Sequence, residues 1–282
     1  MADVRVTVGN VEIVALLDAV MIFPLERFFP SVPPEAWAPV ISQYPNAFAD
    51  TTRLRTNATG YVVRSQGRTI LVDTGLGPGP HEFLGGARGN LLVDMESKGV
   101  RPEAIDLVVI THLHFDHVGW NATVVGEAVR PTFPHARYLI PQVDWEHYRR
   151  PEVFAQSSYI QHTVIALHEL GLVDLVAGER AVTDELTIIP TPGHTPGHQS
   201  LLVQSQGQRA AITGDVAHSP AQVEHPDWSP GADIDPAQSR QTRHRMFDRI
   251  EAEGALMAAC HFPNPGFGRL VRLEGRRVFQ AL

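Results

Sequence analysis

Residues 111–119 read THLHFDHVG, and they directly follow an apolar run, residues 105–110, that predicts a buried strand. A turn at the end of such a strand can direct alternating side chains into one cavity, because successive side chains of an extended segment point to opposite faces. The ligand-type side chains of this stretch are His112, His114, Asp116 and His117. Histidines that only satisfy hydrogen bonds would explain one or two of them. Four within six residues predict a metal site, and imidazole with carboxylate suits Zn²⁺, Mn²⁺, Fe or Co²⁺.

Three further ligand-type side chains each stand at the predicted end of a strand, beside a glycine or proline turn. They are His194 in the run TPGHTPGH, Asp215 in the run TGD and His261 in the run CHFP. The simplest division of all seven gives one metal ion three histidines and the other two histidines and a carboxylate, with the second carboxylate bridging. Two ions about 3.5–4 Å apart can hold a bridging hydroxide at neutral pH, because metal binding lowers the pKa of water toward about 7.

The composition excludes several classes of protein. Hydrophobic residues make up 43% and charged residues 19% of the 282 residues, which is typical of a globular protein with a sizeable core. The net charge of -8 is spread along the chain without a basic stripe, so we expect no nucleic-acid partner. The apolar runs are too short to cross a membrane, and the first residues lack the pattern of a secretory signal peptide. Together with the single cysteine, Cys260, these features predict a cytoplasmic protein without a membrane partner.

The order of the predicted elements indicates a layered α/β fold. Two hairpins of β-branched runs are expected near the start, at residues 4–8 with 11–17 and at residues 60–64 with 69–73. From residue 90 onward, helical and strand patterns alternate. Strand clusters flanked by helices in two similar halves predict an α/β (α+β layered) sandwich. Because no change of composition marks a linker, we interpret residues 1–282 as a single domain.

A proline- and aromatic-rich stretch, residues 19–56, separates the two hairpins. It is predicted to be irregular, and it contains six prolines together with several phenylalanines and Trp37. A long segment of this kind either covers a site or forms a docking surface, and a loop simply wrapped on to the core is an equal alternative. We expect it to border the active site.

In their order along the chain, these motifs resemble the metallo-β-lactamase superfamily. The resemblance is carried by the runs HLHFDH, PGHTPGH and Gly-Asp and by a histidine after a strand. An Asp-Thr-Gly turn at residues 73–75 precedes them. The resemblance implies an αββα sandwich with the site at one edge of the two sheets. The ligands that it implies are His112, His114 and His194 for one ion, Asp116, His117 and His261 for the other, and Asp215 for both. Asp73 would orient one of these ligands or the turn around it.

Details of the motifs favour the binuclear hydrolases of this superfamily. The redox di-iron branch carries glutamate where His114 stands. The run GDVAHSPAQ at residues 214–222 and the ending CHFP are similar to methyl parathion hydrolase and its lactonase-like relatives. N-acyl homoserine lactonases share the metal motif but usually carry a tyrosine three residues after the bridging aspartate, where this chain has His218. Lactones nevertheless stay open as substrates.

We therefore expect a metal-dependent hydrolase of small ester-like substrates, either a lactone or an organophosphate triester. Two divalent metal ions per chain are expected, with zinc first and manganese, cobalt or iron as alternatives. The predicted catalytic residues are Asp116, which would pass a proton to the leaving group, Asp215, which would bridge the ions, and His218. The last would polarise a substrate oxygen or shuttle protons, and a purely structural role for it is an equal alternative. Relatives also lead us to expect a homodimer.

Three alternative functions stay open: a mononuclear iron persulfide dioxygenase, a nuclease of the same fold and a metal-binding scaffold without activity. An apolar substrate pocket is expected from Phe23, Phe28, Phe29, Trp37 and Phe267. His198 is expected to form structural hydrogen bonds. Cys260 is expected to be a small buried hydrophobe pointing away from the site, because neighbours on a strand face opposite sides.

Overall fold

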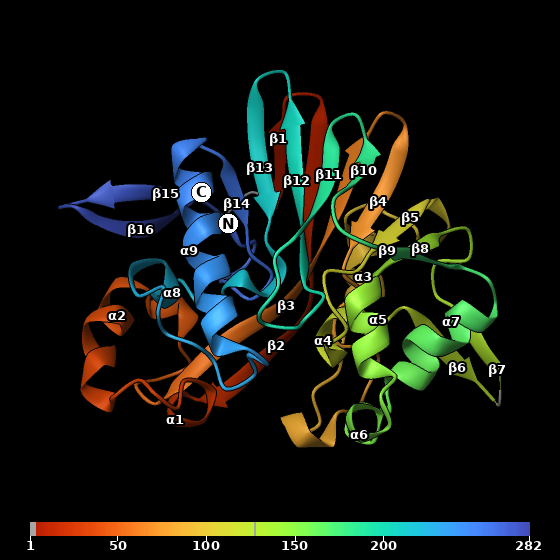
Figure 1. Ribbon diagram of the computed structural model, residues 1–282, viewed down its shortest axis with the longest axis horizontal. Helices are drawn as coiled ribbons and strands as arrows, with labels where there is room; N and C mark the ends of the chain where they lie inside the picture. The colour runs from red at the N-terminus through yellow and green to blue at the C-terminus, as the bar shows by residue number, and fades with distance from the viewer. Residues whose placement is uncertain (1–3, 127) are drawn as a thin grey trace.

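The structure is a computed structural model that describes residues 4–126 and 128–282. Two seven-stranded sheets are stacked face to face, and helices cover their outer faces (Figure 1). A separate two-stranded sheet pairs β6 (Ala122–Val125) with β7 (Ala128–Pro131). This arrangement confirms the predicted αββα sandwich.

The first sheet is mixed. The order of its strands is β1 (Arg5–Val8), β2 (Val11–Pro24), β3 (Arg53–Ser65), β4 (Arg68–Val72), β5 (Leu107–Val109), β8 (Arg137–Pro141) and β9 (Val173–Val176). The first four strands form an antiparallel meander, whereas β4, β5, β8 and β9 run parallel to one another. Parallel strands end at the same edge of a sheet, so the turns that follow them lie close together.

The second sheet is built from the C-terminal half of the chain. The order of its strands is β10 (Arg180–Thr183), β11 (Leu186–Pro190), β12 (Gln199–Ser205), β13 (Gln208–Ile212), β14 (Leu256–Ala258), β15 (Phe267–Leu273) and β16 (Arg276–Ala281). Only β13 and β14 are parallel neighbours, with Ile212 opposite Ala258. The turns after these two strands therefore begin side by side.

Helices pack on the outer faces of both sheets. Their bounds are α1 (Leu25–Phe28), α2 (Trp37–Gln43), α3 (Leu91–Ser97), α4 (Phe115–Val118), α5 (Gln142–Tyr148), α6 (Pro151–Phe154), α7 (Ala166–Glu169), α8 (Ala221–Glu224) and α9 (Pro236–Ala252). Met95, Trp145 and Leu167, from α3, α5 and α7, share one core with the outer face of the first sheet. Phe247 and Ile250 of α9 pack on the second sheet.

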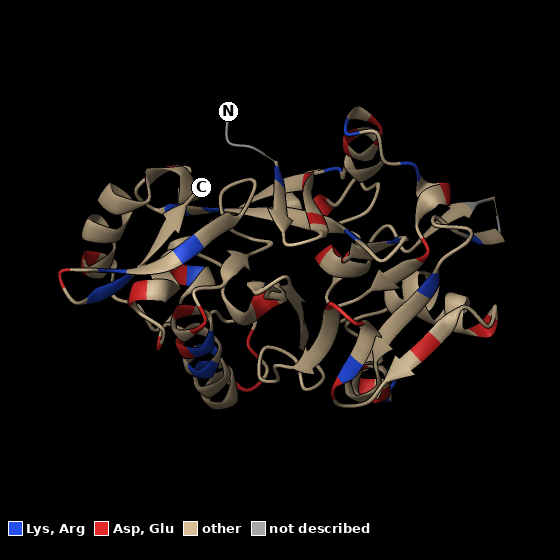
Figure 2. Cartoon of the chain, turned by 90° about the horizontal axis from the view of Figure 1, so that it is seen from above, with Lys and Arg blue, Asp and Glu red and all other residues tan. Residues whose placement is uncertain are grey.

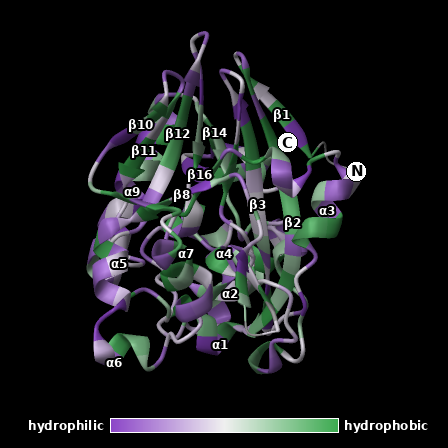
Figure 3. Cartoon of the chain, turned by 90° about the vertical axis from the view of Figure 1, so that its right-hand side faces the viewer, coloured by the Kyte–Doolittle hydropathy of each residue, from purple (hydrophilic) through white to green (hydrophobic). Residues whose placement is uncertain are grey.

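Alternating side chains explain why the sheets are stacked. On β4, Ile70 and Val72 point into the core between the sheets, while Leu71 points to the helical layer. All three are buried, and burying an aliphatic side chain of this size contributes about 1.5–3 kcal/mol. Figure 3 accordingly shows hydrophobic strands in the interior and more hydrophilic residues on the outer helices.

The stretch predicted to be irregular is shorter than expected. β2 continues to Pro24 and β3 begins at Arg53, so only residues 25–52 lie outside this sheet. Ala19 and Met21 are buried while Val20 and Ile22 are exposed, which is the alternation of a strand. The sequence pattern hid this strand because its exposed positions are also hydrophobic.

The described surface matches the expected charge pattern. Figure 2 shows acidic and basic residues interspersed along the chain. Among the described residues, no helix combines the length and hydropathy that a membrane span requires.

Candidate metal centre

Four turns at one edge of the sandwich carry the predicted ligands. The turn after β5 carries His112 and His114 and leads into α4, which carries Asp116 and His117. The turns after β11, β13 and β14 carry one ligand-type residue each, namely His194, Asp215 and His261. All seven predicted residues are brought together, because the strands before these turns end at the same edge of the two sheets (Figure 1).

Three imidazoles form the first donor group with a carboxylate. His114 Nδ1 lies 3.1 Å from His112 Nε2 and 2.9 Å from His194 Nε2. Asp215 Oδ2 lies 3.5 Å from His112 Nε2 and 3.1 Å from His194 Nε2. One ligand atom from each of the four residues lies within 4.8 Å of all the others, which is a spacing that one metal ion can span.

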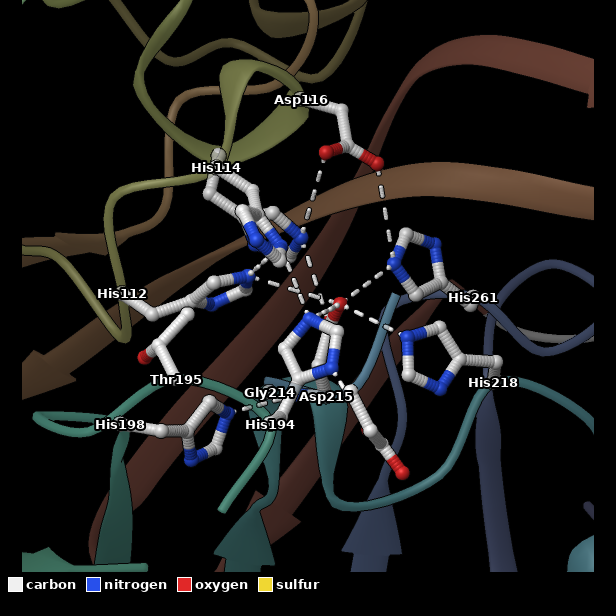
Figure 4. A network of polar contacts seen from close by, with 12 residues as sticks. His112, His114, Asp116, His194, Thr195, His198, Gly214, Asp215, His218 and His261 are labelled. Carbon is white, nitrogen blue, oxygen red and sulfur yellow. Dashed lines mark hydrogen bonds and ion pairs between the residues drawn. The ribbon is translucent and has the colours of Figure 1, made fainter. Parts of the chain in front are cut away.

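The second donor group shares the same carboxylate. Asp215 Oδ1 lies 3.2 Å from His117 Nε2, and Asp215 Oδ2 lies 3.1 Å from His261 Nε2. The carboxylate of Asp116 closes this group, at 3.9 Å from His117 Nε2 and 3.7 Å from His261 Nε2. In Figure 4, dashed lines join Asp116 and Asp215 to the imidazoles around them. Asp215 therefore belongs to both donor groups.

The imidazoles are oriented from outside the centre. Each of four rings donates its Nδ1–H to a neighbouring oxygen: His112 to Thr111 Oγ1 at 3.0 Å, His117 to Asp73 Oδ2 at 2.8 Å, His194 to Asp233 Oδ1 at 2.9 Å and His261 to the Asn57 carbonyl at 2.6 Å. A ring with its proton on Nδ1 presents the Nε2 lone pair to the centre, which is how metal-binding histidines are held. His117 Nε2 is buried without a hydrogen-bond partner among the described residues.

The electrostatics of His112 and His114 also suit a metal ion. Burial, assisted by the neighbouring His117, lowers the pKa of His112 well below its ordinary value. Burial and the neighbouring His194 do the same for the pKa of His114. Both rings are therefore neutral at pH 7, and neutral imidazole is the form that binds a metal. The donor set and its buried lone pairs fit divalent metal ions.

A comparison of the whole sequence identifies the family. The pattern of the metallo-beta-lactamase superfamily matches residues 54–261. The chain belongs to this superfamily. The N-acyl homoserine lactonase AiiA of Bacillus thuringiensis subsp. kurstaki is 23% identical over 220 residues, which are 71% of this chain and 79% of that protein. The N-acyl homoserine lactonase AttM of Rhizobium radiobacter is 31% identical over 133 residues, 44% of this chain and 46% of that one.

Solved structures of the metallo-β-lactamase superfamily share the fold. The hydrolase AbOPH has a TM-score of 0.86 at 24% identity, covering 100% of this chain and 98% of its own. AidC, a dizinc quorum-quenching lactonase solved with the product N-hexanoyl-L-homoserine, has a TM-score of 0.84 at 20% identity, covering 99% and 96%. The chain is thus one of the metal-dependent hydrolases of the superfamily, related to quorum-quenching lactonases.

A cavity of about 520 Å³ opens above the metal centre. Its walls include Met21, Phe23, Phe28, Phe83, Leu84 and Phe115, and its floor includes His114, Asp116, His194, Asp215, His218 and His261. Phe23 and Phe28 lie where they were predicted. The prediction was wrong for Phe29, Trp37 and Phe267, because these three side chains are buried in hydrophobic clusters instead of facing the cavity.

The predictions for two residues beside the centre, His198 and Cys260, have different outcomes. His198 stays outside the donor groups, as predicted: its Nδ1 lies 2.8 Å from Thr191 Oγ1, and its Nε2 accepts the backbone N–H of Asp215 at 2.8 Å. The prediction for Cys260 was wrong in orientation. β14 ends at Ala258, so Cys260 belongs to a turn, and its Sγ lies 3.2 Å from Asp215 Oδ1.

Sequence reasoning missed three residues that organise the centre. Asp233 holds His194, and the Asn57 carbonyl holds His261. Asp144, on α5, accepts hydrogen bonds from the backbone N–H of Leu113 and Gly197 and from the Thr195 hydroxyl, at 3.2, 2.6 and 2.8 Å. It therefore joins the turn of His112 and His114 to the turn of His194. No local motif marked these residues, since each acts across a long sequence separation.

Proposed function

We propose that the chain is a binuclear hydrolase that opens lactones carrying an apolar substituent. The observation that carries this proposal is the pair of donor groups that share Asp215 on the floor of a mostly apolar cavity. A shared carboxylate suits two ions held a few ångströms apart, and an apolar cavity suits a substrate that binds through burial.

The two donor groups support a division of the residues between two ions. His112, His114 and His194 would hold one ion, Asp116, His117 and His261 the other, and Asp215 both. When bound, the ions would supply Lewis acidity and a nucleophilic hydroxide at neutral pH. Zinc is the proposed metal, because imidazole-rich sets with carboxylates suit it and because the structural neighbour AidC is a dizinc enzyme.

Two residues of the cavity floor, Asp116 and His218, would transfer the proton and orient the shared carboxylate. Asp116 lines the cavity, so its carboxylate would take up the proton of the attacking oxygen and pass it to the leaving oxygen. His218 Nε2 lies 3.1 Å from Asp215 Oδ2, and burial lowers the pKa of His218 to about 4. As a neutral ring, His218 would donate to the shared carboxylate and keep it oriented while substrate binds beside it.

The aromatic walls of the cavity favour a substrate with an apolar substituent. Phe28 of α1 packs edge-to-face against His218, with ring centroids 5.6 Å apart, and Phe23 packs against Phe28 at 5.2 Å. This wall comes from the strand end and short helix at the start of the proline- and aromatic-rich segment. We propose that the segment borders the active site within one domain and that it binds the apolar substituent of the substrate.

An organophosphate triester is the second candidate substrate. It is also uncharged and compact. His218 stands where N-acyl homoserine lactonases usually carry a tyrosine, and the run GDVAHSPAQ at residues 214–222 resembles methyl parathion hydrolase. The same residues would serve this reaction, with the phosphoryl group in place of the carbonyl group.

Initial rates on a matched panel test the proposal. The metal-loaded protein and Asp215→Ala would be assayed with γ- and δ-lactones of increasing acyl length, acyl homoserine lactones, paraoxon, methyl parathion and nitrocefin. We expect metal-dependent turnover of lactones that Asp215→Ala abolishes. Turnover of the triesters alone would replace the first candidate with the second. No turnover of any of them with two ions bound would overturn the proposed substrate class.

A further inference from the structure

The side chain of Arg243 is fully buried, although it is an arginine on the outer helix α9. All five of its N–H groups have an acceptor. Nε donates to the Val216 carbonyl at 2.7 Å, and Nη1 donates to the carbonyls of Pro226 and Trp228 at 2.7 and 3.1 Å. Nη2 donates to Ser239 Oγ at 2.9 Å and to Asp233 Oδ2 at 3.4 Å. A buried guanidinium is tolerated only with such complete pairing.

Four of these five acceptors belong to residues 216–233, the segment that runs from the Asp215 turn to the partner of His194. Val216 directly follows the shared ligand Asp215, and Asp233 closes the segment at its other end. Between them the chain carries His218, which lines the cavity floor. Arg243 therefore holds both ends of this segment against one helix.

Asp233 connects Arg243 to His194, one of the proposed metal ligands. Its Oδ2 pairs with Arg243, and its Oδ1 accepts the Nδ1–H of His194 at 2.9 Å. The side chains of Asp233 and Arg243 are both 0% exposed, so without Arg243 the carboxylate would be an unpaired buried charge. Asp233 would then no longer be held in this orientation, and His194 would lose the acceptor that keeps its Nε2 lone pair toward the centre.

We propose that Arg243 is a positioning residue for metal binding, which orients His194 through Asp233 and the Asp215 turn through the Val216 carbonyl. This inference rests on the proposed metal centre but not on the proposed substrate. Packing alone does not account for Arg243, because Met246, Phe247 and Ile250 already attach α9 to the second sheet.

The test compares two variants of α9 that both weaken the fold. Arg243→Met removes the guanidinium but keeps an apolar side chain, and Met246→Ala removes buried volume next to it without touching Asp233. Arg249→Met, at an exposed position of the same helix that pairs with Glu253, is the neutral control. Zinc affinity of each metal-free protein would be measured by competition with a chromogenic chelator, bound zinc by elemental analysis and the fold by circular dichroism.

We expect Arg243→Met to weaken binding of at least one zinc ion by about 10–100-fold, as loss of an outer partner of a metal ligand does. Met246→Ala and Arg249→Met should keep wild-type affinity. Equal losses in Arg243→Met and Met246→Ala, or no loss in either, would overturn the inference.

Two further variants test the inference if Arg243→Met does not fold. Arg243→Lys keeps the charge but has three N–H donors instead of five. Asp233→Asn keeps the shape of the side chain but removes its negative charge. Both should lose zinc affinity in the same direction, and wild-type affinity in both would overturn the inference. Because zinc binding is measured without substrate, an inactive wild type that binds two zinc ions would contradict only the proposed substrate.

Discussion

The thiol of Cys260 donates a hydrogen bond to Oδ1 of Asp215 across 3.2 Å. The thiol thus contacts the shared carboxylate from inside the protein, and it lies close to His117 and His261 as well. A thiol that donates to a carboxylate supports that ligand, whereas a thiolate would compete with it for the metal ion.

Cobalt substitution distinguishes these two roles of Cys260. We expect the cobalt-loaded protein to lack the strong near-ultraviolet band of a thiolate-to-cobalt charge transfer, because the sulfur is a hydrogen-bond donor. Cys260→Ser should keep two ions bound, and Cys260→Ala should lose about 1–2 kcal/mol of stability with the hydrogen bond. A charge-transfer band that disappears in Cys260→Ser would show that the thiolate is a ligand.

Asp73 is expected to control the second donor group. Its Oδ2 accepts the Nδ1–H of His117, and its Oδ1 accepts the backbone N–H of Thr111 at 2.7 Å. Asp73→Asn should therefore lower metal affinity by about 10–100-fold, since His117 loses its oriented partner. Isothermal titration of the metal-free protein measures this loss. Asp106→Asn, whose side chain accepts the backbone N–H of Thr69 in β4, is the control. Similar affinities in the two variants would contradict the role of Asp73.

Removal of Asp144 should destabilise the protein even without metal. Its three buried donors would lose their acceptor in Asp144→Ala, and we expect a loss of about 2–4 kcal/mol in the free energy of unfolding. Asp174→Ala removes an exposed carboxylate paired with Arg137 and should cost less than about 1 kcal/mol. Urea denaturation in the presence of a chelator compares the two, and losses of equal size would refute the structural role of Asp144.

The aromatic wall of the cavity should select for the length of the substituent. Phe23→Ala removes apolar surface beside Phe28, so KM should rise more for long-chain than for short-chain lactones, by about tenfold for the longest. The control is Val20→Ala, on the same strand but outside the cavity lining, which should leave both KM values unchanged. An equal rise for short and long chains would show that Phe23 does not contact the substituent.

Asp18 provides a pH-dependent test of the fold away from the metal ligands. Burial outweighs the N–H donors of Leu76, Leu91 and Trp120 and raises the pKa of Asp18 above 3.8. Because the folded pKa exceeds the unfolded one, the contribution of Asp18 to stability is fully present below pH 3.8 and is lost as pH rises through the folded pKa.

The comparison with Asp18→Asn isolates this contribution. With chelator present, the stability difference between wild type and Asp18→Asn should shift against the wild type as pH rises from about 4 to 7. Chemical denaturation of both proteins over this range measures it. A shift in favour of the wild type would mean that the hydrogen-bond donors outweigh burial at this carboxylate.

Much of the fold and of the candidate site could be predicted from short stretches of sequence. The spacing of His112, His114, Asp116 and His117 after an apolar strand sets donor side chains around one turn, and that geometry is local. Strand and helix periodicity likewise determined the layers, because each pattern depends on residues a few positions apart. The length of β2 was missed since Val20 and Ile22 are hydrophobic on the exposed face as well.

The sequence by itself therefore predicted which residues would bind metal, and it determined the layers that carry them. Only the tertiary structure decided what holds those residues in place and what surrounds the substrate. Asp233 and Arg243 orient His194 from 39 and 49 positions away, and Asp144 joins two turns that are far apart along the chain. Such contacts depend on how the sheets and helices pack, which no local pattern of residues encodes. For the same reason, Phe29 and Trp37 are core residues while Phe28 beside them faces the cavity.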